Sequence, residues 1–144
     1  MPITIKTKKD IENMRIAGQK AAAVLNMLDK YVVPGITTEE LDKIAFDYIT
    51  RDLKCIPANV GYNGYPKTLC TSLNNVICHG IPSETQTLKD GDILNIDVTV
   101  IENKWHGDTS KMYAVGKIQN FAKRLIDVTQ ECMYQGIKKV RPGE

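Results

Sequence analysis

The chain has 144 residues with 42% hydrophobic and 25% charged side chains, a composition typical of one soluble globular domain. Nineteen basic and 17 acidic residues leave a net charge of +2, too small and too evenly spread to indicate a nucleic-acid-binding surface. No apolar run approaches the roughly 20 residues that span a bilayer. The N-terminus lacks the apolar core of a secretory signal, and the four cysteines form no Cys-x-x-Cys pair. We therefore expect reduced thiols, a cytoplasmic location, and neither a DNA nor a membrane partner.

Two helices are predicted in the first third of the chain, over residues 7–33 and 37–53. Apolar side chains recur at helical spacing in both segments, and a Pro-Gly pair separates them. Each segment begins with a threonine followed three residues later by an acidic residue, the form of a capping box. The two pairs are Thr7 with Asp10 and Thr37 with Glu40.

Short apolar segments and turn residues follow in the middle of the chain. Helices and strands are largely segregated, which predicts an α+β fold with helices on one face of an antiparallel sheet. The predicted elements are short strands over 68–73 and 76–78, a glycine-rich loop over 61–66, a strand over 92–101, its antiparallel partner over 104–115 and a third helix over 119–140.

The predicted hairpin carries two aspartates. Asp97 lies in the middle of the first strand, where aspartate is disfavoured, and alternation turns it away from the apolar face. With a two-residue turn at Glu102 and Asn103, Asp97 lies directly opposite Asp108. A three-residue turn would shift the register by one and, without a bulge, place the two carboxylates on opposite faces.

Two opposed carboxylates repel each other unless they share a proton or bind cations. Hard oxygen ligands on rigid strands suit divalent first-row metals. Two such ions about 3.5–4 Å apart can polarise a carbonyl and activate a water. The alternative is that Asp97 and Asp108 are solvated or ion-paired surface residues.

Two further features are candidates for chemistry. His79, in Cys78-His79-Gly80-Ile81-Pro82, follows a short strand and is placed to donate to a substrate amide or act as an acid; otherwise it caps the loop. The loop over 61–66 holds two tyrosines and lacks the ending of a phosphate loop, so it forms either a pocket wall or a surface turn. We expect His106 to lie behind the site or on the surface.

Four motifs in order resemble type I methionine aminopeptidase, and the resemblance covers essentially the whole chain. It implies the N-terminal half of a pita-bread fold, whose two halves enclose a dinuclear metal site. The motifs are Gly61-Tyr62-Asn63-Gly64-Tyr65-Pro66-Lys67, Ser72-Leu73-Asn74-Asn75-Val76-Ile77-Cys78-His79-Gly80-Ile81-Pro82, Asp90-Gly91-Asp92-Ile93-Leu94-Asn95-Ile96-Asp97-Val98 and His106-Gly107-Asp108-Thr109-Ser110-Lys111-Met112.

The resemblance also implies roles for these residues. The activity would be removal of the N-terminal methionine from nascent proteins, with two divalent ions (Co, Mn, Fe or Zn) and one monovalent ion (Na or K). The expected partners are nascent polypeptides and the ribosome, and the protein is expected to be a monomer. Asp97 and Asp108 match metal ligands, His79 the catalytic histidine that contacts the scissile amide, Tyr62, Tyr65 and Cys70 the methionine pocket, and Asn74 and Val76 the monovalent-cation site.

The family's other ligands, one histidine and two glutamates, lie in a second half that these residues do not include. We therefore expect residues 1–144 to be a single partial peptidase domain, inactive or nearly so alone, with the third helix and the apolar face of the sheet partly uncovered. Asn63 replaces a histidine found in some members. Two alternatives are a non-catalytic pita-bread module that binds protein or nucleic acid, and an enzyme of the prolidase or aminopeptidase P type, which usually carries an additional N-terminal domain.

Overall fold

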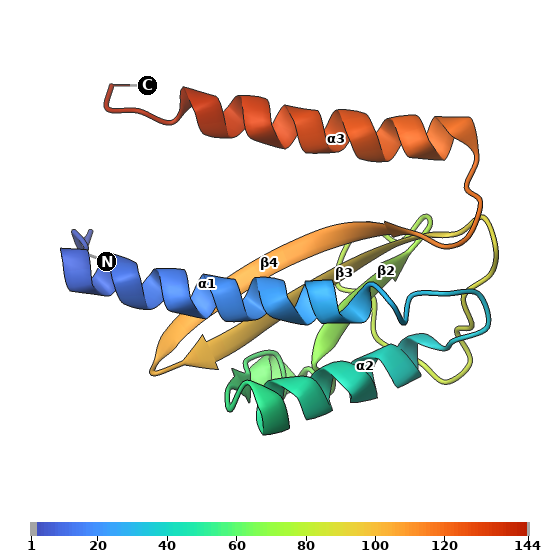
Figure 1. The fold of residues 1–144 in the computed structure, drawn as a ribbon, viewed down its shortest axis with the longest axis horizontal. Coiled ribbons are helices and arrows are strands. Elements are labelled where there is room, and N and C mark those ends of the chain that lie inside the picture. The colour runs from blue at the N-terminus through green and yellow to red at the C-terminus, as the bar shows by residue number, and fades with distance from the viewer. Residues whose placement is uncertain (1–2, 144) are drawn as a thin grey trace.

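A four-stranded antiparallel sheet with two helices packed on one face forms the body of the molecule (Figure 1). This computed structural model describes residues 3–143. No helix within that range has the length and apolar character needed to cross a membrane. The elements are α1 (Lys8–Leu28), α2 (Thr38–Asp47) continued by a π-helical turn (Tyr48–Asp52), β1 (Ile56–Pro57), a 3₁₀ turn (Tyr62–Gly64), β2 (Leu69–Leu73), β3 (Ile93–Glu102), β4 (Trp105–Ala114) and α3 (Asn120–Lys139). The α+β class is as predicted.

Both predicted capping boxes are present. The Thr7 side chain accepts from the Asp10 N–H, and the Asp10 carboxylate accepts in return from the Thr7 N–H at 2.8 Å. Thr37 and Glu40 make the same reciprocal pair at the start of α2. These bonds satisfy donors that a helix start leaves without partners and so fix where each helix begins. α1 ends at Leu28, five residues before the predicted end.

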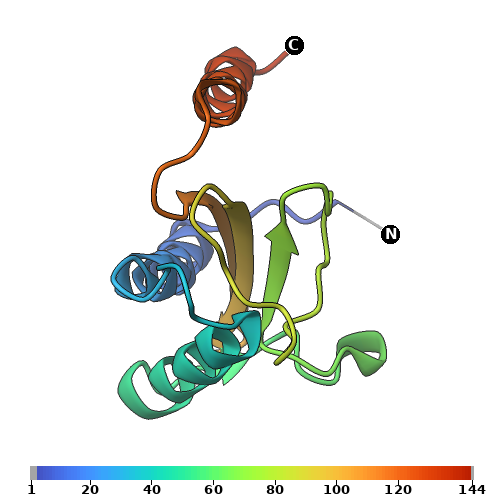
Figure 2. The ribbon, with the colours of Figure 1, turned by 90° about the vertical axis from the view of Figure 1, so that its right-hand side faces the viewer.

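Strand β3 is the centre of the sheet. β4 pairs along one edge of β3, while β1 and β2 pair with successive parts of its other edge. The apolar side chains of β3 face α1 and α2 and are fully buried: Leu94, Ile96, Val98 and Val100. The expectation that this apolar face would be partly uncovered is therefore wrong, because the chain's own helices cover it (Figure 2).

Gly107 allows the close packing of α1 against the hairpin. A Cβ atom on Gly107 would lie 2.1 Å from the carbonyl oxygen of Ala17, a separation that no side chain tolerates. Ala17 is itself fully buried. The small residues at these two positions therefore set the distance between helix and sheet.

Helix α3 stands apart from the rest of the molecule in both views (Figures 1 and 2). Of its described residues only Ala122 is buried. The predicted helix is present with nearly the predicted bounds, and its apolar face is uncovered as expected. Exposed apolar side chains on it include Phe121, Leu125, Val128, Met133, Tyr134 and Ile137.

Two local predictions are wrong. Residues 76–78 form no strand; they follow a turn in which the Val76 N–H donates to the carbonyl of Leu73 at 3.0 Å. The hairpin turn lies one residue later than predicted, at Asn103 and Lys104, which both have positive φ. Two such residues in succession give the turn whose twist matches the flanking strands.

Candidate metal and substrate site

The displaced turn changes the pairing of the two aspartates. Asp97 pairs with Ser110, and Asp108 pairs with Thr99. The prediction that the carboxylates lie directly opposite each other is therefore wrong. The register differs from the predicted one by two residues, an even number, so both side chains still point to the same face. They are diagonal neighbours across the β3–β4 ribbon.

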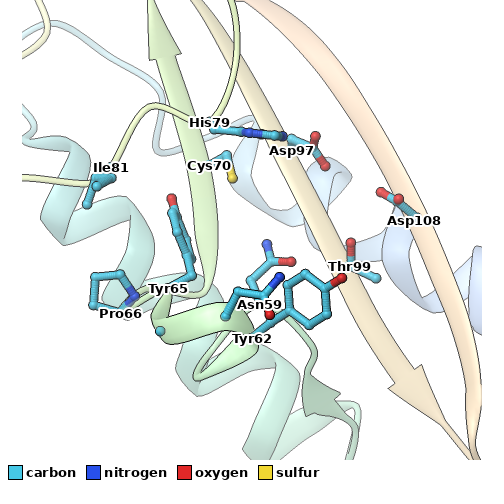
Figure 3. A pocket seen from close by; sticks show the side chains of 12 residues that line it. Asn59, Tyr62, Tyr65, Pro66, Cys70, His79, Ile81, Asp97, Thr99 and Asp108 are labelled. Carbon is cyan, nitrogen blue, oxygen red and sulfur yellow. The ribbon is translucent and has the colours of Figure 1, made fainter.

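A pocket of about 600 Å³ opens on this face of the sheet (Figure 3). The structure brings together there six of the residues singled out from the sequence, drawn from five separate parts of the chain. These are Tyr62, Tyr65, Cys70, His79, Asp97 and Asp108. The remaining lining residues are Asn59, Asn63, Gly64, Pro66, Ile81 and Thr99.

Strand β2 places the apolar wall beside the carboxylates. Cys70 pairs directly with Asp97 and is buried. Burial raises the pKa of the Cys70 thiol, so it stays protonated at neutral pH. The Tyr65 hydroxyl donates to the Leu69 carbonyl at 2.9 Å and lies 3.2 Å from the Gly80 carbonyl, which holds its ring against the pocket. Tyr62 is 71% exposed, at the pocket rim.

His79 is held by an unusual backbone. Its φ is +56°, in the left-handed region that side chains other than glycine rarely adopt. The next residue, Gly80, lies against β2, where its carbonyl accepts from the Thr71 N–H at 2.7 Å. A Cβ on Gly80 would lie 2.1 Å from the Thr71 carbonyl oxygen. Glycine at 80 thus lets the loop lie on β2 and brings His79 to the pocket.

The electrostatics of the site favour a bound cation. Burial raises the pKa of Asp97, the negative charge of Asp108 raises it further, and the charge of His79 opposes the shift. A cation between the carboxylates would reverse that field. However, no group of three or more His, Cys, Asp or Glu side chains within residues 3–143 is arranged to hold a metal ion. Asp97 and Asp108 therefore fit a divalent ion only as part of a ligand set.

Other predicted residues lie outside the pocket. Asn74 is in the turn after β2, where its side chain donates to Asp92 at 2.9 Å and accepts from the Ile93 N–H at 3.1 Å. Val76 follows in the same turn and is exposed. His106 is exposed and does not line the pocket.

Two polar residues of the lining were given no role in the sequence analysis. Strand alternation predicts Thr99 on the face of Asp97, and the structure has it there. Asn59 carried no such signal, because it lies in an irregular segment. Its position depends on a hydrogen bond from its side-chain amide to the Thr68 carbonyl at 3.0 Å.

Known proteins resemble this chain in sequence and in structure. The methionine aminopeptidase of Salmonella typhimurium strain LT2 is 57% identical over 143 residues, which cover 99% of this chain and 54% of that protein. The crystal structure of methionine aminopeptidase from Rickettsia prowazekii superposes with a TM-score of 0.95 at 49% identity, covering 99% of this chain and 56% of that one. An Xaa-Pro dipeptidase from Bacillus anthracis superposes with a TM-score of 0.80 at 19% identity, covering 97% of this chain and 38% of that one, a likeness of fold alone.

The chain spans about half the length of the curated relatives it matches. Its fold is that of the pita-bread peptidases over the part it covers, which agrees with the fold expected from the sequence. The sequence profile of metallopeptidase family M24 matches residues 12–144. This chain belongs to metallopeptidase family M24.

Proposed function

We propose that this chain supplies part of a methionine aminopeptidase, which removes the N-terminal methionine of nascent polypeptides. The observation that carries the proposal is the position of Asp97 and Asp108 on one face of a rigid ribbon, beside a pocket with an apolar wall. The high identity to methionine aminopeptidases supports the same reading. The proline-specific peptidases share only the fold, so the prolidase alternative has no observation in its favour.

Asp97 and Asp108 are the proposed metal ligands. Two divalent ions, chosen from Co, Mn, Fe and Zn, would supply Lewis-acid polarisation of the scissile carbonyl and a water of lowered pKa. The two carboxylates would hold one side of that centre, with further ligands from outside residues 1–144. We also propose that Asn74 and Val76 hold a monovalent cation, Na or K, in the turn after β2.

The pocket side chains would select and orient the substrate. Cys70 and the ring of Tyr65 present a soft wall of the kind that suits a methionine thioether, and Tyr62 would close the rim. His79 lies beside Asp97, where an N–H of its ring would donate to the scissile amide (Figure 3). Such a bond strengthens as negative charge develops on the substrate and so favours the transition state.

We also propose how much of the enzyme these residues form and where the enzyme acts. Residues 1–144 would form one partial peptidase domain, and they would be inactive or nearly so alone, because two carboxylates are too few ligands for a divalent ion. The substrate would be the free N-terminal methionine of chains leaving the ribosome, in the cytoplasm. The longer protein would act as a monomer.

The test compares this chain alone with the same chain joined to the part of the Salmonella typhimurium enzyme that it does not cover. Methionine release from the peptide Met-Ala-Ser is measured with added Co²⁺ or Mn²⁺. We expect turnover from the joined protein and none from the chain alone. Turnover by the chain alone at a comparable rate would refute the partial metal site, and a folded but inactive joined protein would refute the assigned activity.

His79→Ala and Asp97→Ala in the joined protein then test the roles. Loss of a substrate-amide contact should lower kcat by roughly 10²-fold or more while the metal content is unchanged. Loss of a ligand should lower the metal content as well as the rate. Asp127→Asn, on the exposed surface of α3, is the matched control and should leave both unchanged.

A further inference from the structure

A cluster of three reactive side chains lies outside the pocket, where the β3–β4 ribbon meets its turn. Lys20 comes from α1, Cys55 directly precedes β1, and Glu102 ends β3. The Lys20 ammonium lies 2.7 Å from Glu102 Oε2, and the Cys55 sulfur lies 3.2 Å from the same oxygen. The amine also donates to the Leu53 carbonyl at 3.0 Å. A primary amine and a thiol are thus held on one carboxylate oxygen.

The fold fixes this convergence. Ile56 pairs with Ile101, so the residues next to them, Cys55 and Glu102, lie side by side across the β1–β3 edge. Cys55 is 6% exposed, whereas the side chains of Lys20 and Glu102 are 27% and 17% exposed. The sulfur therefore lies just beneath a partly open charged pair, within reach of a small solute.

Contacts among Lys20, Cys55 and Glu102, together with burial, determine which of the three side chains carry a proton. The pKa of Glu102 is lowered, first by Lys20 and then by Cys55, and the pKa of Lys20 is raised by Glu102. Burial raises the pKa of the Cys55 thiol. The resting cluster is therefore a carboxylate that accepts from an ammonium and from a thiol S–H.

We propose that Cys55 and Lys20 form an oxidative cross-link when the protein meets hydrogen peroxide. In the first step peroxide converts the Cys55 thiol to a sulfenic acid, and the second peroxide oxygen leaves as water. In the second step the Lys20 ammonium gives a proton to Glu102, and its nitrogen attacks the sulfur. An S–N bond forms, the S–OH bond breaks, and the hydroxyl leaves as water with a second proton from nitrogen.

The surroundings of Cys55 favour attack by Lys20 on the sulfenic acid over other reactions of that sulfenic acid. A sulfenic acid can donate its O–H to Glu102 as the thiol did, so it stays beside the amine. The low exposure of Cys55 hinders the thiols of other molecules, which are larger than peroxide, from reaching the sulfenic acid. The same burial slows the first step, because the thiolate rather than the thiol attacks a peroxide oxygen. We therefore expect exposed thiols such as Cys132 to oxidise first, without forming this link.

The experiment treats the 144-residue chain with hydrogen peroxide, digests it with trypsin and measures peptide masses. The expected product joins residues 16–30, uncleaved after Lys20, to residues 55–67, with a mass two hydrogen atoms below the sum of the two peptides. Thiol reductant should release both peptides. Recovery of Cys55 as free thiol, as a sulfinic acid or in a disulfide, with cleavage after Lys20 intact, would overturn the proposal. A joined pair that carries an additional oxygen atom would overturn the S–N bond.

Two variants sharpen the result. Lys20→Arg keeps the cation beside Glu102 but replaces the amine with a weakly nucleophilic guanidinium, so the joined peptide should be lost. Cys132→Ser removes an exposed thiol and should leave the yield unchanged. Thermal unfolding before treatment establishes that both variants are folded; persistence of the joined mass in Lys20→Arg would overturn the assignment to Lys20.

Discussion

Asp97 and Asp108 are diagonal neighbours on adjacent strands, each paired with a hydroxyl residue of the other strand rather than with the other aspartate. Diagonal neighbours in an antiparallel pair lie roughly 7–8 Å apart, farther than directly opposed residues. This arrangement keeps both carboxylates on one face, where the charge of Asp108 acts on Asp97. It is the geometry on which the proposed metal chemistry depends.

Replacing Asp97 with Asn should stabilise the metal-free chain at pH 7. The substitution removes a partly buried charge and its repulsion with Asp108, a gain expected to be below about 1 kcal/mol. Because burial and Asp108 raise the pKa of Asp97, the penalty is present above that raised pKa and disappears as pH falls toward the ordinary value of 3.8. Thermal unfolding with a chelator present should therefore show a higher Tm for the variant at pH 7 and a smaller difference in acid. An equal or lower Tm at pH 7 would contradict this.

The sequence predicted the parts of the fold that depend on local signals. Capping boxes located the starts of α1 and α2, and alternation placed Asp97 on the polar face of β3. The register could not be predicted, because Asn103 and Lys104 form their turn without the glycine that usually marks it. The strand predicted over residues 76–78 is also absent. The path of residues 76–80 depends on hydrogen bonds to β2 that no local pattern encodes.

Gly107→Ala should destabilise the chain by about 1–3 kcal/mol, because the added methyl group would press on the backbone of α1 at Ala17. Gly136→Ala is the matched control. Gly136 lies in α3 with open space around it, and alanine is favoured over glycine within a helix by roughly 1 kcal/mol. Urea unfolding of both variants measures the effects. Equal stability of the two variants would contradict the close packing of α1 on β4.

Acid should weaken the start of α2. The backbone N–H of Thr37, and then its hydroxyl, lower the pKa of Glu40 below its ordinary value of 4.5. A lowered pKa means that the contribution is present above the unfolded-state value and is lost as pH falls through the folded-state value. Glu40→Gln should therefore lower the Tm at pH 7 and have less effect below pH 4.5. If the difference in Tm between Glu40→Gln and the parent does not change with pH, the Glu40 charge does not stabilise the start of α2.

Leu125→Glu should leave the free energy of unfolding within about 0.5 kcal/mol of the parent, because Leu125 is 59% exposed on α3. It should also reduce self-association, since it interrupts an uncovered apolar surface. Leu28→Glu in α1 is the contrast, because Leu28 is fully buried and a charge there should prevent folding. Urea unfolding and sedimentation measure both properties. Marked destabilisation by Leu125→Glu would mean that α3 packs on the rest of the chain.

The most direct test of the central claim is calorimetric titration of Mn²⁺ into the joined protein described under the proposed function. We predict that Asp97→Asn and Asp108→Asn each weaken binding by roughly 10²-fold or more, while the α3 control Asp127→Asn binds like the parent. Unchanged affinity in both aspartate variants, with the fold intact, would contradict the claim that these carboxylates hold the metal.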